Sequence, residues 1–479
     1  MVFFHCNHLV AAGPALSDAA GPVFPLRNWL FTQLGLPLNR WTDVVFSLLL
    51  IATVYVGIIS LTALLGIWGE RKVAGRIQSR RGPNRVGKFG LLQSIADGVK
   101  LITKEDLSPG CADRPLFRLA PYLAFVPVFA AFLAIPFGPE MTFEPRLAVG
   151  VFWILAVLSV EVLGVILAGW ASNNKWAVYG AMREACQVVS YEIPLGLSIV
   201  TAVLTAGTLN LVALGHLQSG GLHTWIVFRS PFVLAAFFVY FVASLASNKR
   251  APFDLPESES ELVAGYHTEY SGLRFSFFFF AEYAGMFVVA AIQTALFLGG
   301  WNDPFGLLGY YHHKFLTDPS GPNGWGLIAV NLTGVAIFMT KCAILIYIQM
   351  WIRWTLPRPR IDQVLYACVK VLLPMACVLL LGAALWALFL PERAGVPWRD
   401  YHPFSAEGWS GAYGALTTQV LLALLGLTFV ALIVGWVGHA FATGRGLKQR
   451  LTEPAPIDAP YRGPLGSGKP PADGKMAPA

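Results

Sequence analysis

The chain has 479 residues, of which 56% are hydrophobic and 13% are charged. Because soluble domains carry about 25% charged residues, this composition excludes a soluble globular protein. The formal net charge of +7 comes mainly from an uneven distribution of Lys and Arg between the apolar stretches, so it does not indicate a nucleic-acid-binding protein.

Nine apolar stretches, each close to the ~20 residues that a bilayer-spanning helix requires, follow one another along the chain. They are longer than the strands of a membrane barrel and do not alternate in polarity. The predicted fold class is therefore all-α, a polytopic membrane helical bundle of about nine transmembrane helices. The predicted spans are 44–67, 119–137, 147–170, 185–206, 231–247, 275–300, 326–351, 365–390 and 413–441.

The basic residues predict the orientation of this bundle. If the segment after the first span is cytoplasmic and the sides then alternate, 24 of the 34 Lys and Arg residues lie in inside segments and 7 in outside segments. The positive-inside rule therefore predicts an external N-terminus and a cytoplasmic C-terminus. The predicted cytoplasmic loops are 69–115, 171–184, 248–274 and 352–364.

The six cysteines form neither a CxxC motif nor a cluster with histidine. Their spacing predicts no metal site, no haem and no iron–sulfur cluster in this chain. If the protein serves a redox enzyme, the electrons travel in another chain.

The first loop contains an amphipathic segment. Over 88–104, apolar residues recur on one helical face, and Gln93, Asp97, Lys100 and Lys104 lie on the other. Such a helix lies along a membrane surface with its apolar side down. Two interpretations remain open, a surface anchor bound to anionic lipid and a lid over a cavity at the membrane surface.

The third loop is acidic. Glu257, Glu259 and Glu261 follow Pro256, which can open a helix, and helical spacing places Glu257 and Glu261 on one face. Acidic residues in a first helical turn often only stabilise the helix dipole, but this explanation does not account for Asp254.

Ionisable residues lie inside predicted spans, among them Glu161, Glu192, Glu282 and Lys341. An ion at membrane depth is costly, so such groups are paired, protonated or in contact with a water-filled path. A salt bridge between Lys341 and one glutamate is one alternative, but it leaves two acids that require protonation or water. Carboxylates of this kind suit proton transfer, so the sequence predicts proton handling.

Four loop stretches carry a resemblance to a known family. They are GERKVAGRIQSRRGPNRVGKFGLLQSIADGVKLITKED (69–106), GWASNNKWAVYGAMREACQVVSYEIPL (169–195), RAPFDLPESESELVAGYHTEYSG (250–272) and RWTLPRPRIDQV (353–364). With these stretches in this order, the chain over about 41–390 resembles the H subunit family of the proton-pumping NADH–quinone oxidoreductase, respiratory complex I, of the mitochondrial subunit 1 type.

The resemblance implies an eight-helix membrane domain at 41–390, which forms part of a quinone channel and holds a carboxylate path toward the pump subunits. Outside it, 1–40 is predicted as an external N-terminal segment and 391–444 as an extra transmembrane helix. The last segment, 445–479, is rich in Pro, Gly and Lys and is predicted as a disordered cytoplasmic tail.

The resemblance also implies roles for individual residues. The quinone-binding candidates are Glu70, Arg71, Arg76, Asp97, Lys100, Arg353 and Arg358. The catalytic candidates of the proton path are Glu161, Glu192, Asp254, Glu257, Glu259, Glu261 and Glu282, with Arg183, Tyr191, Arg250 and Lys341 in supporting positions.

The implied substrate is quinone, and no cofactor is expected in this chain, because FMN and the iron–sulfur clusters are expected in partner subunits. The expected partners are the peripheral-arm iron–sulfur and quinone-site subunits, small membrane-arm subunits and antiporter-like subunits, together with membrane lipid. The expected location is the inner membrane of a bacterium.

Two positions depart from the family pattern, since Ser247 stands where the family usually has glutamate and Ile361 where it has tyrosine. The alternatives are the corresponding subunit of a membrane-bound hydrogenase or related dehydrogenase, an independent cation/proton antiporter, and a purely structural anchor. The match over 250–272 favours the quinone enzyme. The lack of an inverted repeat speaks against an antiporter, and the buried glutamates speak against an anchor.

Overall fold

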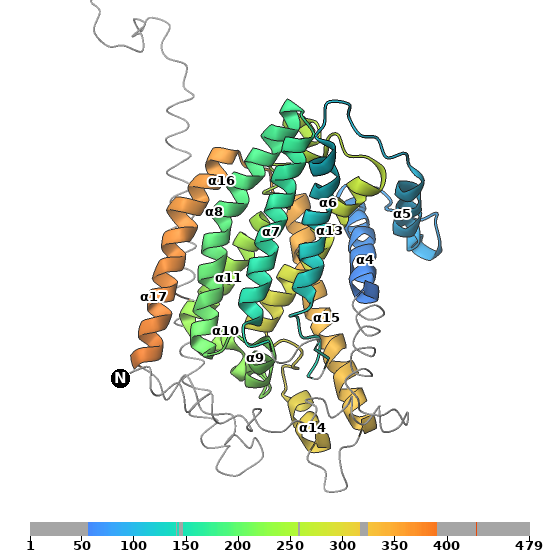
Figure 1. Ribbon diagram of the computed structural model, residues 1–479. Coiled ribbons are helices and arrows are strands. Elements are labelled where there is room, and N and C mark those ends of the chain that lie inside the picture. Colours follow the sequence, from blue (N-terminus) through green and yellow to red (C-terminus); the bar gives the residue numbers. More distant parts are fainter. Residues whose placement is uncertain are drawn as a thin grey trace, which may run out of the picture. The chain divides into compact units, whose positions relative to one another are not determined.

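A computed structural model describes residues 56–139, 141–142, 147–256, 259–316, 324–389 and 428 (Figure 1). All of these except Thr428 belong to one structural unit, and Thr428 belongs to a second. Every regular element in the described ranges is a helix, which confirms the predicted all-α fold class.

Among the described residues, six helical segments are long and apolar enough to cross a membrane. They lie in α6 (Arg114–Phe132), α7 (Gly150–Ala171), α8 (Lys175–Ala206), α13 (Gly272–Phe297), α15 (Gly324–Thr355) and the continuous stretch formed by α16 (Ile361–Ala367), η6 (Cys368–Leu372) and α17 (Leu373–Phe389). The polytopic membrane character is thereby confirmed.

Two further helices account for two more predicted spans. The fifth span coincides with the apolar helix α11 (Pro231–Ser247), and α4 (Val56–Ile77) contains the described part of the first. The ninth predicted span, 413–441, lies outside the described residues apart from Thr428.

The largest boundary difference concerns α8, which begins ten residues before the predicted span. The side chain of Asn174 accepts a hydrogen bond from the amide of Trp176 at 3.0 Å, which caps the helix at this point. The predicted loop 171–184 therefore shrinks to a short turn. Glu192 consequently lies near the middle of α8 and not about two turns into it.

The amphipathic segment of the first loop is also shorter than predicted. Its helix, α5, covers Gln93–Thr103, while Lys88–Gly90 forms a separate 3-10 turn, η3. Gly87 and Phe89 both have positive φ, at 73° and 60°, which interrupts the helix before Gln93. In Figure 1, α5 lies beside α4, at the end of the bundle where α7 turns into α8.

The remaining elements are short. They are α9 (Leu211–Leu217), η4 (Leu222–Thr224), α10 (Ile226–Arg229), α12 (Glu259–Leu262), η5 (Gly265–His267) and α14 (Leu307–Leu316). Figure 1 places α9, α10 and α14 at the end of the bundle opposite to the α7–α8 turn.

Small side chains bring α6 and α7 into close contact. A Cβ at Gly164 of α7 would lie 2.6 Å from the backbone nitrogen of Ala124 in α6, so only glycine permits this approach. At one end of this interface the ring of Phe117 stacks on that of Tyr270, with centroids 4.1 Å apart. The loop before α13 is thereby fixed against α6 and α7, close to the charged residues described next.

Candidate functional site

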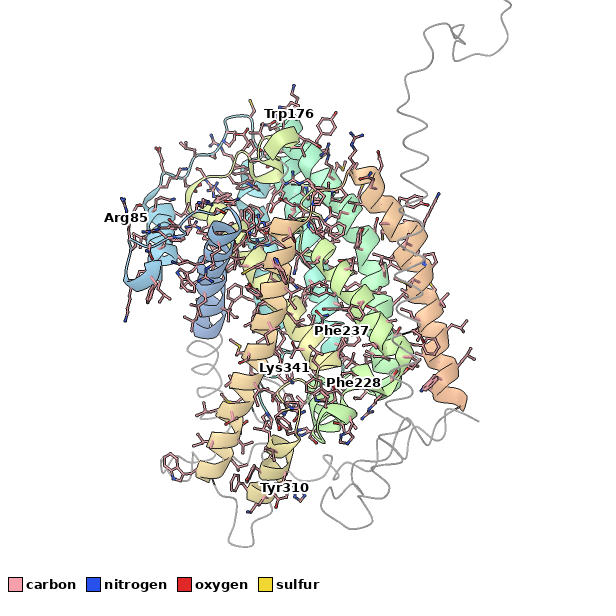
Figure 2. All side chains as sticks on the ribbon, turned by 180° about the vertical axis from the view of Figure 1, so that it is seen from behind. Arg85, Trp176, Phe228, Phe237, Tyr310 and Lys341 are labelled. Carbon is pink, nitrogen blue, oxygen red and sulfur yellow. The ribbon has the colours of Figure 1, made fainter. Side chains whose placement is uncertain are left out.

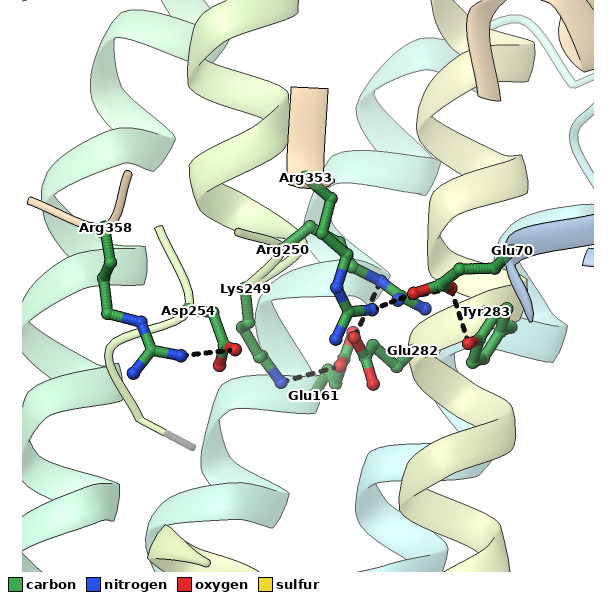
Figure 3. Close-up of polar contacts among 9 residues, drawn as sticks. All are labelled: Glu70, Glu161, Lys249, Arg250, Asp254, Glu282, Tyr283, Arg353 and Arg358. Atoms are coloured by element: carbon green, nitrogen blue, oxygen red, sulfur yellow. Dashed lines mark hydrogen bonds and ion pairs between the residues drawn. The ribbon is translucent and has the colours of Figure 1, made fainter. Parts of the chain in front are cut away.

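The candidate site is built around two consecutive cations, Lys249 and Arg250, which directly follow α11 (Figure 3). Their exposed fractions are only 6% and 3%. Lysine and arginine are almost never this deeply buried unless they are paired. The backbone of Lys249 has a φ of 57°, in the left-handed region that non-glycine residues rarely adopt. The chain therefore turns sharply here, and the two side chains reach different partners.

The Arg250 group contains two carboxylates and two guanidinium groups. Arg250 Nη1 lies 2.9 Å from Glu70 Oε2, and Arg250 Nε lies 2.7 Å from Glu282 Oε1. Arg353 of α15 also forms an ion pair with Glu70. Tyr283 donates a hydrogen bond of 2.6 Å to Glu70, and its ring lies 4.2 Å from the guanidinium carbon of Arg250. This group joins α4, α13 and α15 with balanced charge.

The Lys249 group contains one ammonium and two carboxylates. Lys249 Nζ lies 3.0 Å from Glu161 Oε1 on α7 and 2.5 Å from Glu184 Oε1 on α8. Burial by itself lowers the pKa of Lys249, but the two carboxylates raise it by more, so that the pKa of this ammonium lies above its usual value. Lys249 therefore remains charged between the two acids.

The segment that follows Arg250 is fixed from two sides. Gln187 of α8 donates hydrogen bonds to the carbonyl oxygens of Ala246 and Phe253, at 2.7 and 2.8 Å. Arg358, a quinone-site candidate, forms a 3.0 Å ion pair with Asp254, a proton-path candidate. The structure thus brings members of the two predicted sets together.

A second, more exposed group lies on α4 and α5. Arg71 forms an ion pair with Asp97, and Lys100 lies 3.9 Å from the same carboxylate. Ser94 donates a 3.1 Å hydrogen bond to the carbonyl oxygen of Leu64, which holds α5 against α4. The apolar face of α5 remains exposed at Ile95, Val99 and Ile102, and Leu91 and Leu92, directly before the helix, are exposed too. The predicted quinone-site residue Arg76 is exposed as well.

Glu192 lies apart from these ion pairs. It is half-buried in α8, beside Ser159 and Glu161 of α7. Within the described ranges, no basic side chain forms an ion pair with it, so the structure does not support the alternative of a fixed ion pair at this residue.

Two of the predicted supporting residues lie at the edge of the site. Tyr191 donates its hydroxyl to the carbonyl oxygen of Val364 at 2.9 Å, which attaches α8 to α16. Arg183 lies 2.5 Å from Glu261, as a residue that orients the acidic loop would.

Lys341 is distant from the other candidates. Its ammonium donates hydrogen bonds of 2.6–3.0 Å to the carbonyl oxygens of Leu298, Gly300 and Asn302, where α13 has ended. On α15 it lies about 18 Å from Arg353, at 1.5 Å per residue. Figure 2 likewise shows it toward the opposite end of the bundle from Trp176. The considered salt bridge with a buried glutamate is wrong, and Lys341 stabilises the end of α13 instead.

The acidic loop is described only in part. Glu257 lies outside the described residues, and for Glu259 only the backbone is described, at the start of the one-turn helix α12. The sequence predicts a helix that Pro256 can open, and the described part of the loop contains only the single turn of α12, which ends where Val263 has a φ of 66°.

Sequence reasoning does not find Lys249, Glu184 and Tyr283. In the sequence Lys249 counts only as an orienting charge, and Glu184 falls in the predicted loop. A signal for Glu184 exists, since it follows Gly180 and Ala181 and precedes Gln187 at helical spacing, and these residues form the buried face of α8. Extending α8 to its Asn174 cap reveals Glu184 as a buried acid.

Comparisons with known proteins identify the family of this chain. The model of the family described as NADH dehydrogenase matches residues 49–384. The H subunit of the NADH-quinone oxidoreductase of Chlorobium luteolum is 45% identical over 370 residues, which cover 75% of this chain and 96% of the relative. The H subunit of Chlorobaculum parvum is 43% identical, with 73% and 98% covered, and that of Anaeromyxobacter dehalogenans is 42% identical, with 74% and 87% covered. The chain therefore belongs to the NADH dehydrogenase family, as the membrane-embedded H subunit of a bacterial NADH–quinone oxidoreductase that its loop stretches predict.

Proposed function

We propose that this chain forms part of the quinone channel of the oxidoreductase and couples quinone reduction to proton translocation through its buried carboxylates. The observation that carries the proposal is the run of buried ionisable groups from Glu70 through Arg250 and Lys249 to Glu161. Buried charges are costly, and a subunit that served only as an anchor would have no use for them.

The quinone side of the proposal rests on the group at α4 and α5. Quinone carbonyl oxygens accept hydrogen bonds, and Arg71, Lys100 and Arg353 are cationic donors held near Asp97 and Glu70. The exposed apolar face of α5 suits a hydrophobic isoprenoid tail as well as lipid. A quinone headgroup that changes charge beside Arg353 changes the electrostatic environment of Glu70, because Arg353 and Arg250 both contact this carboxylate.

The proton side rests on α7 and α8. Glu192 lies next to Glu161 but without a cation of its own among the described residues, so its charge is not balanced locally. Pro194 leaves the carbonyl oxygen of Ser190 without its usual helical donor, and the thiol of Cys368 donates a 3.0 Å hydrogen bond to it instead. Electrons reach the quinone through FMN and iron–sulfur clusters in partner subunits, and the charged end of the bundle faces the cytoplasm and those subunits.

The test is Glu192→Gln in the complete complex, expressed from the native locus, because glutamine keeps the size and hydrogen bonding of glutamate but cannot titrate. We expect assembled complex to remain at the parental amount, while NADH–quinone activity and proton pumping in inverted membrane vesicles fall steeply. Glu192→Asp should retain part of both. Asp106→Asn is the matched control, because Asp106 forms a partly exposed ion pair with Arg274 outside the site.

Normal assembly together with normal pumping in Glu192→Gln would contradict the proton-path role. Loss of assembled complex would instead make Glu192 a structural residue. The control variant Asp106→Asn should keep both pumping and assembly, because exposed ion pairs contribute only about 0–1 kcal/mol to the free energy of unfolding.

A further inference from the structure

The loop that follows α13 directs three backbone carbonyl oxygens at one point, at the opposite end of the bundle from Lys249 and Arg250. The ammonium of Lys341, on α15, occupies this point and donates hydrogen bonds of 2.6–3.0 Å to all three oxygens. They belong to Leu298, Gly300 and Asn302. A lysine ammonium has three N–H donors, so each donor has one oxygen as its partner.

An aromatic ring adds a further wall to this arrangement. Lys341 Nζ lies 4.2 Å from the centroid of the Trp225 ring, and tryptophan is the aromatic side chain that attracts a cation most strongly. Trp225 directly precedes α10 and is only 8% exposed. Three carbonyl oxygens and one ring, which we call the carbonyl cage, thus surround the ammonium with partial negative charge.

Contacts other than those of Lys341 fix the carbonyl cage. Gly299 and Gly300 have φ values of 79° and 55°, in the left-handed region that glycine adopts readily. A Cβ at Gly299 would lie 2.4 Å from Nε1 of Trp225, so glycine permits the close approach of loop and ring. The side chain of Asn302 donates hydrogen bonds of 2.6 and 3.0 Å to the carbonyl oxygens of Gly215 and Gly299. The cage should therefore keep its shape when the side chain of Lys341 is shortened.

Backbone dipoles provide the direct contacts to the cation. Carbonyl groups at the C-terminal end of a helix attract positive charge, and carbonyl oxygens can replace the hydration shell of a monovalent cation. Asp303 lies near enough to act electrostatically on Lys341. Its carboxylate accepts hydrogen bonds of 2.8–3.2 Å from backbone amides at the start of α14, and these amides belong to Phe305, Leu307 and Leu308.

We propose that the carbonyl cage is a binding site for a primary ammonium ion, and that Lys341 is its built-in occupant. In the parental chain the side chain fills the site, so added cations have no specific effect there. When the side chain is shortened, the same oxygens and the ring of Trp225 bind a free primary ammonium ion. K⁺ binds less well, because three carbonyl oxygens replace only part of its hydration shell. The proposal is independent of the proposed function, since neither quinone nor a transferred proton takes part in it.

The test is chemical rescue of Lys341→Ala in the complete complex. Alanine keeps the Cβ of lysine, and propylammonium supplies the three missing carbon atoms and the nitrogen. The purified variant should inactivate on heating several-fold faster than the parent, because its buried carbonyl oxygens have lost their donors. Propylammonium chloride should restore most of the lost half-life in a saturable manner, and KCl should restore less.

Lys341→Met is the matched control variant. Its side chain fills most of the same volume but has neither charge nor donor, so it should be destabilised like Lys341→Ala and should not respond to propylammonium. Choline chloride at the same concentration is the control for ionic strength, because a quaternary ammonium group has no N–H to donate. The half-life of the parental complex should be the same in both salts.

Three results would overturn the proposal. They are equal effects of propylammonium and choline on Lys341→Ala, equal rescue of Lys341→Ala and Lys341→Met, and a Lys341→Ala complex as stable as the parent without any amine. If Lys341→Ala does not assemble, Lys341→Gln decides, because its amide keeps two N–H donors for the carbonyl oxygens. Native electrophoresis should then show more assembled complex for Lys341→Gln than for Lys341→Met, and an equal or smaller amount would contradict the proposal.

Discussion

Removal of the Arg250 guanidinium is the most severe single perturbation of the site. Arg250→Met keeps an apolar side chain of similar length but removes the partner that lies 2.9 Å from Glu70 and 2.7 Å from Glu282. It also removes the cation stacked on the ring of Tyr283. Three helices, α4, α11 and α13, lose the group that joins them.

The magnitude follows from burial. Breaking a buried ion pair by removing one partner costs about 3–5 kcal/mol, because the remaining charge is left in a poorly solvating environment. Glu70 keeps Arg353 and the hydroxyl of Tyr283, which offsets part of the loss at that carboxylate. Because native proteins are stable by only about 5–15 kcal/mol, and changes of about 1–2 kcal/mol already alter abundance several-fold, assembled complex should become scarce.

The assay compares assembled complex in membranes, by native electrophoresis, with its rate of thermal inactivation. Arg274→Gln is the matched control, because it removes a guanidinium from a single pair with Asp106 and from the ring of Phe117, 5.5 Å away, and should cost less than Arg250→Met does. Arg250→Lys should be intermediate, since a compact ammonium cannot reproduce the two-armed contact of a guanidinium. If Arg250→Met assembles and resists heat as well as Arg274→Gln does, the ion-pair group does not hold these helices together.

Two further predictions concern the edges of the site, and a third concerns the orientation of the chain in the membrane. Lys100→Gln should raise the apparent KM for short-chain quinone with the subunit still assembled, whereas an unchanged KM with weaker membrane attachment would support the lipid-anchor interpretation of α5. Ser247→Glu should be tolerated, because Ser247 is half-buried at the end of α11 two residues before Lys249, and failure to assemble would place this position in a packed core. A reporter fused after Ala479 should act as cytoplasmic and one fused after Phe315 as external, and the reverse pattern would overturn the proposed orientation.

The helices could be predicted from the sequence because apolar runs of membrane-spanning length leave few other structures open to the backbone. The ends of these helices could not be predicted in this way. The stretch from Lys175 to Arg183 carries charge and resembles a loop, but these residues extend α8 beyond its apolar part toward the Asn174 cap. The length of an apolar run shows where apolar side chains lie along the chain. The helix continues past the end of that run wherever a cap and tertiary contacts support it.

Part of the site could be predicted as well. The free-energy cost of an ion at membrane depth is enough to single out Glu161, Glu192 and Glu282 as buried acids. The structure places all three in helices near Lys249 and Arg250. Their partners could not be found in this way, because Lys249 and Arg250 lie at a helix end, where cations are also explained by membrane orientation. The ion pairs of these two cations depend on the turn after α11. The left-handed backbone conformation of Lys249, which forms this turn, has no recognisable pattern in the sequence.

The two adjacent cations therefore invite different interpretations, which the proposed variants separate. Arg250 contacts both Glu70 and Glu282, so its loss should reduce assembly. Lys249 contacts two acids, Glu161 and Glu184, so the loss of one of them leaves the ammonium paired with the other and should preserve assembly. Reduced assembly in Glu184→Gln together with normal assembly in Arg250→Met would reverse this assignment, because the stabilising contact would then lie between α7, α8 and Lys249.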